Sequence, residues 1–270
     1  MQTLRLRRRP VRPTRPSATP SQALAQWSFA RRNNANKASV HADAPFASGA
    51  FRWVAKGTYT AGERQGQQCV AKWFKTGVVY ESTFFQKDIQ AVERAQLIVD
   101  EFNGAGIVNN TIEPPRDDPP PLFVQYGSQF RQGGRLQART FYLWLQKHLV
   151  EPYIEGFVKW NSNSGAIFGS TAWDDLMQAL SHFSYHASGG QFVLCDLQGG
   201  LYLDGTVVLT DPVILSRQRT YGVTDLGPEG ITTFFARHQC NKYCREHWTK
   251  PNDRSIHFKL SQGTTMVGLR

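Results

Sequence analysis

The sequence has few cysteines and no long apolar segment. Four cysteines are too few for a disulfide scaffold in a chain of 270 residues. Cys69 and Cys195 lie in apolar runs, where a buried free thiol is the ordinary outcome. We therefore expect an intracellular, reducing setting such as the cytoplasm. Because no apolar run approaches the roughly 18 to 20 residues that cross a bilayer, we also expect no membrane span.

Acidic residues are absent from positions 1–42, which hold eight arginines and one lysine. The remaining chain has 22 basic and 21 acidic residues, so almost all of the net charge of +10 comes from this segment. A nearly neutral body lacks the basic face of a nucleic-acid-binding domain, and we expect no nucleic-acid partner for it. The composition of the segment predicts a disordered basic tail. Two alternatives stay open for the tail: a mitochondrial or other organelle transit peptide, and a contact with nucleic acid or another anionic surface.

Two aspartates each follow a short apolar run. Asp196 comes after residues 192–194 and Asp211 after residues 207–209, and runs of this kind predict short buried strands. Asp204-Gly205 predicts a hairpin turn that would bring both carboxylates to one end of a sheet. Paired carboxylates suit divalent metal binding and proton handling in phosphoryl transfer. The alternative interpretation is that both aspartates are turn residues.

Residues 68–74 alternate in a way that predicts a β-strand, with Lys72 on a face shared with apolar neighbours. A lysine in mid-strand is usually an exposed edge residue. It can also supply the ammonium group that holds nucleotide phosphates, as a strand lysine does in protein kinases. Further along, the Glu151-Pro152 step forces extended backbone and predicts a hinge between two lobes.

Three segments have the features of helices. Apolar residues recur at spacings of three and four over 84–103, where Asn103-Gly104 predicts the helix end. Ser170 or Thr171 predicts the cap of a second helix that has acidic residues in its first turn. Pro228 predicts the start of a third helix.

The third helix leads into a pattern of possible metal ligands, His238-x-Cys240-x-x-x-Cys244. The i, i+4 spacing of its two thiols predicts that both lie on one helical face. Thiolate and imidazole are preferred ligands of tetrahedral Zn²⁺, and His182 or His186 would have to supply the fourth. The alternative is two buried thiols beside a surface histidine. A structural zinc would contribute about 10 kcal/mol or more of apparent folding free energy.

Taken together, these segments resemble the alpha-kinases, which include myosin heavy chain kinases, elongation factor 2 kinase and the kinase domains of TRP channels. The resemblance covers roughly residues 45 to 250 and leaves the basic tail outside. The matching segments, in order, are PFASGAFR (45–52), VAKWF (70–74), EPYIEGFVKWNSNSG (151–165), ALSHFSYHASGGQFVLCDLQG (179–199), LTDPVI (209–214), DLGPEG (225–230) and FFARHQCNKYC (234–244).

The resemblance implies an α+β, two-lobed, protein-kinase-like fold. A β-rich N-lobe would span residues 43–150. A mixed C-lobe with a structural zinc site would span 151–250, and residues 251–270 would form a C-terminal extension beyond the basic tail (1–42) and the two lobes.

The resemblance also implies an ATP-dependent protein serine/threonine kinase that transfers the γ-phosphate to a protein hydroxyl. One departure from the family pattern keeps a second possibility open, a pseudokinase that acts as a nucleotide-binding or interaction module: the connection from Asp196 to Asp211 is longer than usual. A second departure, Thr224 where the family often has glycine, concerns peptide specificity more than ATP binding. The implied residues are Lys72 and Arg52 for the ATP phosphates, Glu151 near the adenine, Asp196 and Gln198 for the catalytic loop, Asp211 for Mg²⁺, and His182, His238, Cys240 and Cys244 for structural Zn²⁺.

Overall fold

A computed structural model of the chain describes residues 37–49, 52–75, 86–107, 122–124, 128–131, 147–201 and 207–267; for 122–124, 128–131 and 147 the description covers the backbone only. The predicted tail up to residue 36, Phe85 of the predicted first helix and the predicted Asp204-Gly205 turn lie outside these ranges. None of the helices in the described part of the chain combines the length and the apolar character needed to cross a membrane.

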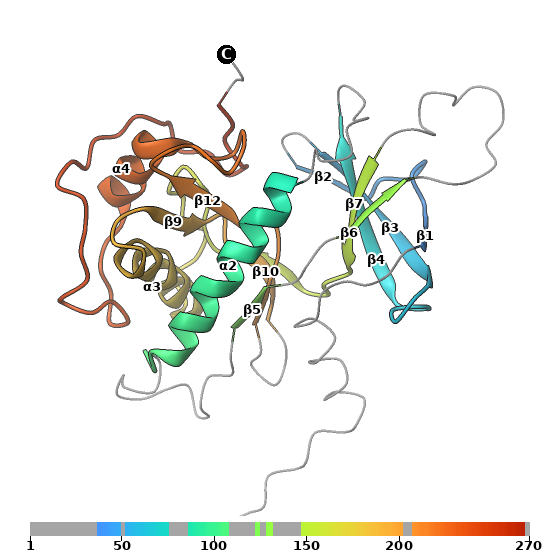
Figure 1. The fold of residues 1–270 in the computed structure, drawn as a ribbon, viewed down its shortest axis with the longest axis horizontal. Helices are drawn as coiled ribbons and strands as arrows, with labels where there is room; N and C mark the ends of the chain where they lie inside the picture. The colour runs from blue at the N-terminus through green and yellow to red at the C-terminus, as the bar shows by residue number, and fades with distance from the viewer. Residues whose placement is uncertain are drawn as a thin grey trace, which may run out of the picture.

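An antiparallel sheet forms the first lobe (Figure 1), with the strand order β1-β3-β4-β7-β6 and with β2 also paired to β3. Residues 37–40, which the sequence assigned to the disordered tail, form the edge strand β1. Their placement is understandable because Ala38 and Val40 pack on the small core around Tyr59 and Cys69. The strands are β1 (Lys37–Val40), β2 (Ala47–Ser48), β3 (Arg52–Ala61), β4 (Gln68–Phe74), β6 (Ser128–Arg131) and β7 (Lys147–Pro152).

Strand β4 lies in the interior of this sheet, between β3 and β7. Its residues from Cys69 to Trp73 are all buried, because both faces of the strand are covered. The interpretation of Lys72 as an exposed edge residue is therefore wrong, and its ammonium group requires a charged partner inside the protein.

Among the described residues, the second lobe contains two smaller sheets and the helices α2, α3 and α4 (Figure 1). One sheet has the order β5-β11-β10-β8, in which only β5 and β11 are parallel, and the other pairs β9 with β12. The bounds are α2 (Gln86–Gly104), β5 (Leu122–Val124), β8 (Phe157–Lys159), α3 (Ala172–Ala187), β9 (Phe192–Cys195), β10 (Gln198–Leu201), β11 (Val207–Leu209), β12 (Val213–Ser216) and α4 (Gly227–Arg237).

Helix α2 and strand β5 come before residue 150 but pack with the second lobe. Ala95, Val99 and Phe102 of α2 share a buried core with Met177 and Leu180 of α3, and β5 pairs with β11. The division of the chain at residue 150 therefore separates these two elements from the core that they help to build.

The predicted helices agree with the observed ones in position and in capping. Helix α2 ends at Gly104 as expected. Thr171 caps α3 in a capping box with Asp174, so that each side chain accepts a hydrogen bond from the other residue's backbone N–H. Pro228 lies in the first turn of α4, where a missing N–H is tolerated.

The predicted hairpin between residues 192–194 and 207–209 is wrong in its pairing. Strand β9 (192–195) pairs with β12, and β11 (207–209) pairs with β10, a strand that the sequence analysis did not expect. Two glycines, Gly199 and Gly200, lower the strand propensity of β10 and explain the omission.

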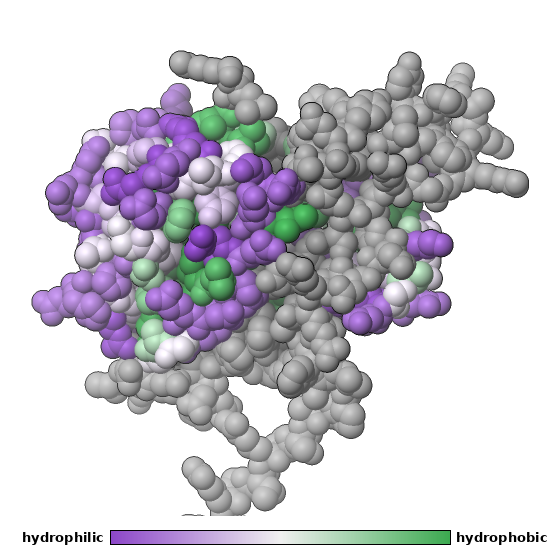
Figure 2. Space-filling view, viewed as in Figure 1, coloured by the Kyte–Doolittle hydropathy of each residue, from purple (hydrophilic) through white to green (hydrophobic). Residues whose placement is uncertain are grey.

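On the face shown in Figure 2, the described surface of the second lobe is mainly hydrophilic, and hydrophobic residues form small separate patches. Two buried clusters of apolar residues, packed with α2, α3 and α4, form the core of this lobe.

Candidate active site and metal centre

Asp196 and Asp211 occupy equivalent positions in the second lobe. Asp196 links β9 to β10, and Asp211 lies between β11 and β12. Because β9 pairs with β12 while β10 pairs with β11, both connections lie where the chain passes from one sheet to the other. Both aspartates have left-handed backbone, with φ of 58° and 48°. A non-glycine residue is rarely found in this conformation, which is concentrated at functional sites.

The surrounding backbone holds the turn at Asp196 in place. The side chain of Asn161 accepts a hydrogen bond from the Leu197 N–H at 2.8 Å, and the Trp160 N–H donates to the Leu197 carbonyl at 2.9 Å. At Gly199 a Cβ atom would lie 1.8 Å from the Val208 carbonyl oxygen, so only glycine fits there. These contacts fix the orientation of the aspartate.

Lys72 lies between two carboxylates. Its Nζ donates to Oε2 of Glu151 and to Oδ2 of Asp211, and Thr210 Oγ1 donates to the same Glu151 oxygen at 3.0 Å. Burial disfavours the charged ammonium, but the two neighbouring charges outweigh it, and the pKa of Lys72 lies above its ordinary value. Lys72 is therefore a permanent positive charge in the interior.

Glu151 has the extended backbone predicted for the Glu151-Pro152 step, and β7 ends at Pro152. Glu151 is buried within strand β7, where it faces Val70 of β4 in the register of the sheet. Burial raises the pKa of its carboxyl group despite the adjacent Lys72. The geometry makes Glu151 the buried anion that holds the lysine.

Arg52 adds a second positive charge. Its guanidinium donates to Asp88 in the first turn of α2 at 2.5 Å and lies 4.0 Å from Asp211 Oδ1. Burial raises the pKa of Asp211, but the charges of Lys72 and Arg52 outweigh this effect and hold it below its ordinary value. Asp211 is consequently ionised at neutral pH.

Asp196 is buried and pairs with a residue that the sequence analysis did not single out. Lys159 Nζ lies 2.8 Å from Asp196 Oδ1, and the Thr264 hydroxyl donates to Asp196 Oδ2 at 2.7 Å. Burial raises the pKa of Asp196, and Lys159 partly opposes this shift. Lys159 stands opposite Gln198 in the β8–β10 pair, so the strand pairing is what places it beside Asp196.

One cleft joins these groups across the two lobes. The amide of Gln198 lies at the edge of hydrogen-bond range, 3.5 Å from both Asp196 Oδ2 and the Asp211 carbonyl. All six residues predicted for catalysis and nucleotide binding line the cleft, together with four charged or hydroxyl residues that were not predicted for these roles. The six are Arg52, Lys72, Glu151, Asp196, Gln198 and Asp211, and the additional four are Asp88, Lys159, Thr224 and Thr264.

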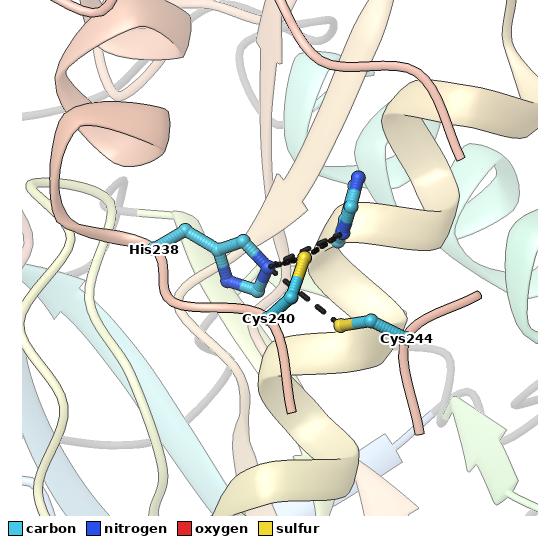
Figure 3. A group of neighbouring side chains, drawn as sticks. His238, Cys240 and Cys244 are labelled. Carbon is cyan, nitrogen blue, oxygen red and sulfur yellow. Dashed lines mark hydrogen bonds between the residues drawn. The ribbon is translucent and has the colours of Figure 1, made fainter. Parts of the chain in front are cut away.

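The four predicted metal ligands form a separate cluster. Figure 3 shows His238, Cys240 and Cys244 pointing toward a common centre. His238 Nε2 lies 3.2 Å from His182 Nδ1 and 3.7 Å from each of the two sulfur atoms, and Cys240 Sγ lies 3.5 Å from His182 Nδ1. All four ligand atoms lie within 4.8 Å of one another.

This spacing suits a tetrahedral zinc ion. Ligands at the usual Zn–N and Zn–S distances of about 2.0 and 2.3 Å stand about 3.3 to 3.8 Å apart. His182 Nε2 donates to the Thr249 carbonyl at 3.1 Å, which leaves Nδ1 unprotonated toward the centre, the usual second-shell arrangement. Burial lowers the pKa of His182 to about 4 and that of His238 to about 3, so both imidazoles are neutral at pH 7.

Two expectations about the cluster are resolved by its geometry. His182 belongs to it, whereas His186 Nδ1 lies 3.4 Å from the Thr249 hydroxyl. The thiols are not on a helical face, because α4 ends at Arg237 and His238 has extended backbone. The ligands come instead from α3 and from the turns that follow α4.

The sequence profile of the Alpha-kinase family matches residues 47–244. The chain belongs to the alpha-kinase family. It is 34% identical over 202 residues to Alpha-protein kinase 1 of Dictyostelium discoideum. The matched region covers 74% of this chain and 13% of that protein. It is 39% identical over 114 residues to human eukaryotic elongation factor 2 kinase. Here the matched region covers 39% of this chain and 14% of that protein. The chain thus spans a small part of the length of these relatives.

Solved alpha-kinase structures have the same fold. An alpha kinase from Entamoeba histolytica superposes with a TM-score of 0.63 at 23% identity, covering 85% of each chain. The alpha-kinase domain of myosin-II heavy chain kinase A in complex with AMP-PNP gives a TM-score of 0.60 at 22% identity, covering 77% of this chain and 86% of that one. The predicted α+β, two-lobed, kinase-like fold is confirmed.

Proposed function

We propose that this alpha-kinase is an ATP-dependent protein serine/threonine kinase. The observation that carries the proposal is the position of Lys72, a buried ammonium that lies between Glu151 and Asp211 in the cleft that also contains Asp196. Phosphoryl transfer requires charge neutralisation and in-line positioning more than covalent chemistry, and these side chains supply both. Family membership and the likeness to the AMP-PNP complex of myosin-II heavy chain kinase A support ATP as the phosphate donor.

Each side chain then has a distinct task. Lys72 and Arg52 hold the phosphates, and Glu151 orients Lys72. Asp211 is ionised and partly accessible, as a Mg²⁺ ligand must be, and bound Mg²⁺ supplies further neutralisation of phosphate charge. Asp196 accepts the proton of the acceptor hydroxyl, because its buried carboxylate has a raised pKa.

We further propose that His182, His238, Cys240 and Cys244 bind a structural zinc ion. The distances and the bond from His182 to the Thr249 carbonyl support this assignment. The metal would join α3 to the turns after α4, on the lobe that carries both catalytic aspartates. Burial raises the pKa of the Cys244 thiol to about 12, so the thiol stays protonated in the absence of a cation. A bound cation would favour the thiolate instead.

The proposal also covers the boundaries of the two lobes and the cellular compartment. We propose lobes of about 43–150 and 151–250, joined after β7, with α2 and β5 packed on the second lobe. All four cysteines are described, and each is free. Free thiols support an intracellular, reducing compartment.

The test is transfer of labelled phosphate from Mg-ATP to a generic basic protein, with wild type compared to Asp211→Ala and with zinc measured in both. We expect transfer by wild type, none by the variant, and one zinc per chain in each. Nucleotide binding without transfer by folded, zinc-loaded wild type would refute the proposal and favour a pseudokinase.

A further inference from the structure

Half of the large exposed apolar side chains in the described part of the chain come from one region of the second lobe. The five residues, out of ten, are Phe157 and Val158 of β8, Ile167 and Phe168 in the chain that follows, and Leu201 at the end of β10. Because β8 pairs with β10 and residue 161 bridges to residue 167, the segments that carry these side chains are neighbours. Single exposed apolar residues are ordinary, but a group of them marks an interaction surface.

One of the five, Phe157, lies on the same face of β8 as the cleft residue Lys159. Successive side chains of a strand alternate between its faces, so Phe157 and Lys159 project from one face and Val158 from the other. Lys159 stands opposite Gln198 in the paired strand, and both residues line the cleft. Phe157 stands opposite Gly200 and is more exposed than Lys159. Phe157 therefore continues the cleft-side face of the sheet outward from Lys159.

The packing around Phe157 leaves its ring open. Its neighbour across the strand pair, Gly200, has no side chain to cover it, and β8 is the edge strand of its sheet among the described residues. Phe157 is 56% exposed and belongs to none of the three buried apolar clusters in the described part of the chain. The ring thus contributes little to the core and is available to a ligand.

The strand that carries Phe157 leads from the proposed base to the surface. Lys159 Nζ lies 2.8 Å from Asp196 Oδ1, and Phe157 is two residues away along β8. Two residues of extended chain span about 6.5 to 7 Å, both in β8 and in a bound peptide. A peptide that lies along β8 and presents its hydroxyl to Asp196 therefore brings the side chain two positions from the acceptor to Phe157.

We propose that Phe157 is a specificity-determining residue for the protein substrate, an inference that rests on the proposed kinase function. Its ring forms an apolar subsite for a large aliphatic or aromatic side chain that lies two positions from the phosphoacceptor. The substrate class is thus an extended protein segment in which a hydroxyl residue and a large apolar residue are separated by one residue. The direction of the bound peptide decides whether the apolar residue precedes or follows the acceptor.

The contribution of this subsite falls on substrate binding. Phe157 lies beyond the groups that contact the phosphates and the proposed base, so its contact with the substrate is the same before and during phosphate transfer. An interaction that is equal in the ground state and in the transition state lowers KM and leaves kcat little changed. An effect confined to KM for the peptide separates this role from one in catalysis.

The experiment uses the full-length, zinc-loaded chain with Mg-ATP and three synthetic peptides that contain a single threonine. The peptides are identical except that leucine stands two positions before the threonine, two positions after it, or at neither position, where alanine replaces it. The generic basic protein serves as a fourth acceptor. The variants are Phe157→Ala, Phe157→Tyr, which keeps the ring, and Val158→Ala, a matched control that is 43% exposed on the other face of the same strand. Zinc content and circular dichroism confirm that each variant is folded.

We expect wild type to prefer one of the two leucine peptides over the alanine peptide by about 10-fold in kcat/KM, with most of the difference in KM. This is the lower end for an apolar contact, because the ring is open to solvent. The preference is lost in Phe157→Ala and kept in Phe157→Tyr and Val158→Ala.

Three results would overturn the inference and leave the kinase function intact. They are transfer to the basic protein without a preference among the peptides, a preference that Phe157→Ala retains, and a preference that Val158→Ala loses equally. Failure of transfer to all four acceptors by folded wild type would overturn both the inference and the proposed function.

Discussion

Replacement of Lys72 by methionine tests the buried charge cluster. Methionine has a similar length and no charge, so Lys72→Met leaves Glu151 buried at 1% side-chain exposure without its cation. Asp211 also loses Lys72, but Arg52 stays 4.0 Å from it and its side chain is 30% exposed, so that water can compensate part of the loss. Removal of one partner of a buried ion pair costs about 3 to 5 kcal/mol. We expect a loss at the lower end of this range, about 3 kcal/mol of unfolding free energy.

A second substitution separates stability from catalysis. Glu151→Gln in the Lys72→Met background removes the orphaned carboxylate and keeps a group that can bond the Thr210 hydroxyl. We expect it to restore about 2 kcal/mol, because a buried polar group without charge is far less costly than a buried ion. Phosphate transfer should stay at least about 100-fold below wild type in both variants, since no cation is left in Lys72's place.

The assay is urea unfolding of zinc-loaded protein, followed by circular dichroism, beside phosphate transfer under native conditions. Glu151→Gln alone completes the double-mutant cycle and gives the coupling energy of the pair. Two results would refute the reasoning. One is a Lys72→Met variant as stable as wild type within about 0.5 kcal/mol, the range of neutral surface changes. The other is recovery of phosphate transfer by the double variant without a lysine.

Three further predictions concern other parts of the site. Lys159→Met should move the acidic limb of the kcat/KM profile to higher pH, because Lys159 lowers the pKa of Asp196 and the carboxylate is the active form. Cys244→Ser should release zinc and lower the melting temperature, whereas His186→Gln, on the same helix as the ligand His182 but outside the cluster, should retain one zinc per chain. Gly199→Ala should destabilise the protein by about 3 kcal/mol or more in thermal unfolding, because its Cβ would clash with β11.

Each of these three predictions has a result that would contradict it. An acidic limb that stays in place or moves to lower pH would exclude Asp196 as the titrating base. Equal zinc content in the Cys244 and His186 variants would show that the thiol is not a ligand. An unchanged melting temperature for Gly199→Ala would show that β10 and β11 can separate at little cost.

Local rules were sufficient for the elements that local interactions define. The capping box of Thr171 and Asp174 lies within four consecutive residues, and α2 follows from apolar periodicity, so both were predictable from the sequence. Motif order identified the six cleft residues and selected the four members of the His/Cys cluster. In each case the signal lies in residue types and spacings that do not depend on the fold.

The tertiary structure decided which of these residues meet. Lys72 pairs with Glu151, 79 positions away, and strand pairing alone brings Lys159 to Asp196. The pairing of β9 with β12 contradicted the local hairpin signal, because the glycines of β10 conceal a strand that tertiary pairing stabilises.

The segment 257–267 depends on tertiary structure most completely. It has no periodicity of its own, and its order comes from side chains such as Asn163 that lie about a hundred residues earlier. The sequence determined the chemistry available to this protein, since residue types fix which groups can carry charge or bind metal. Only the fold determined the arrangement, because contacts between distant residues depend on the packing of the whole chain and leave no local pattern.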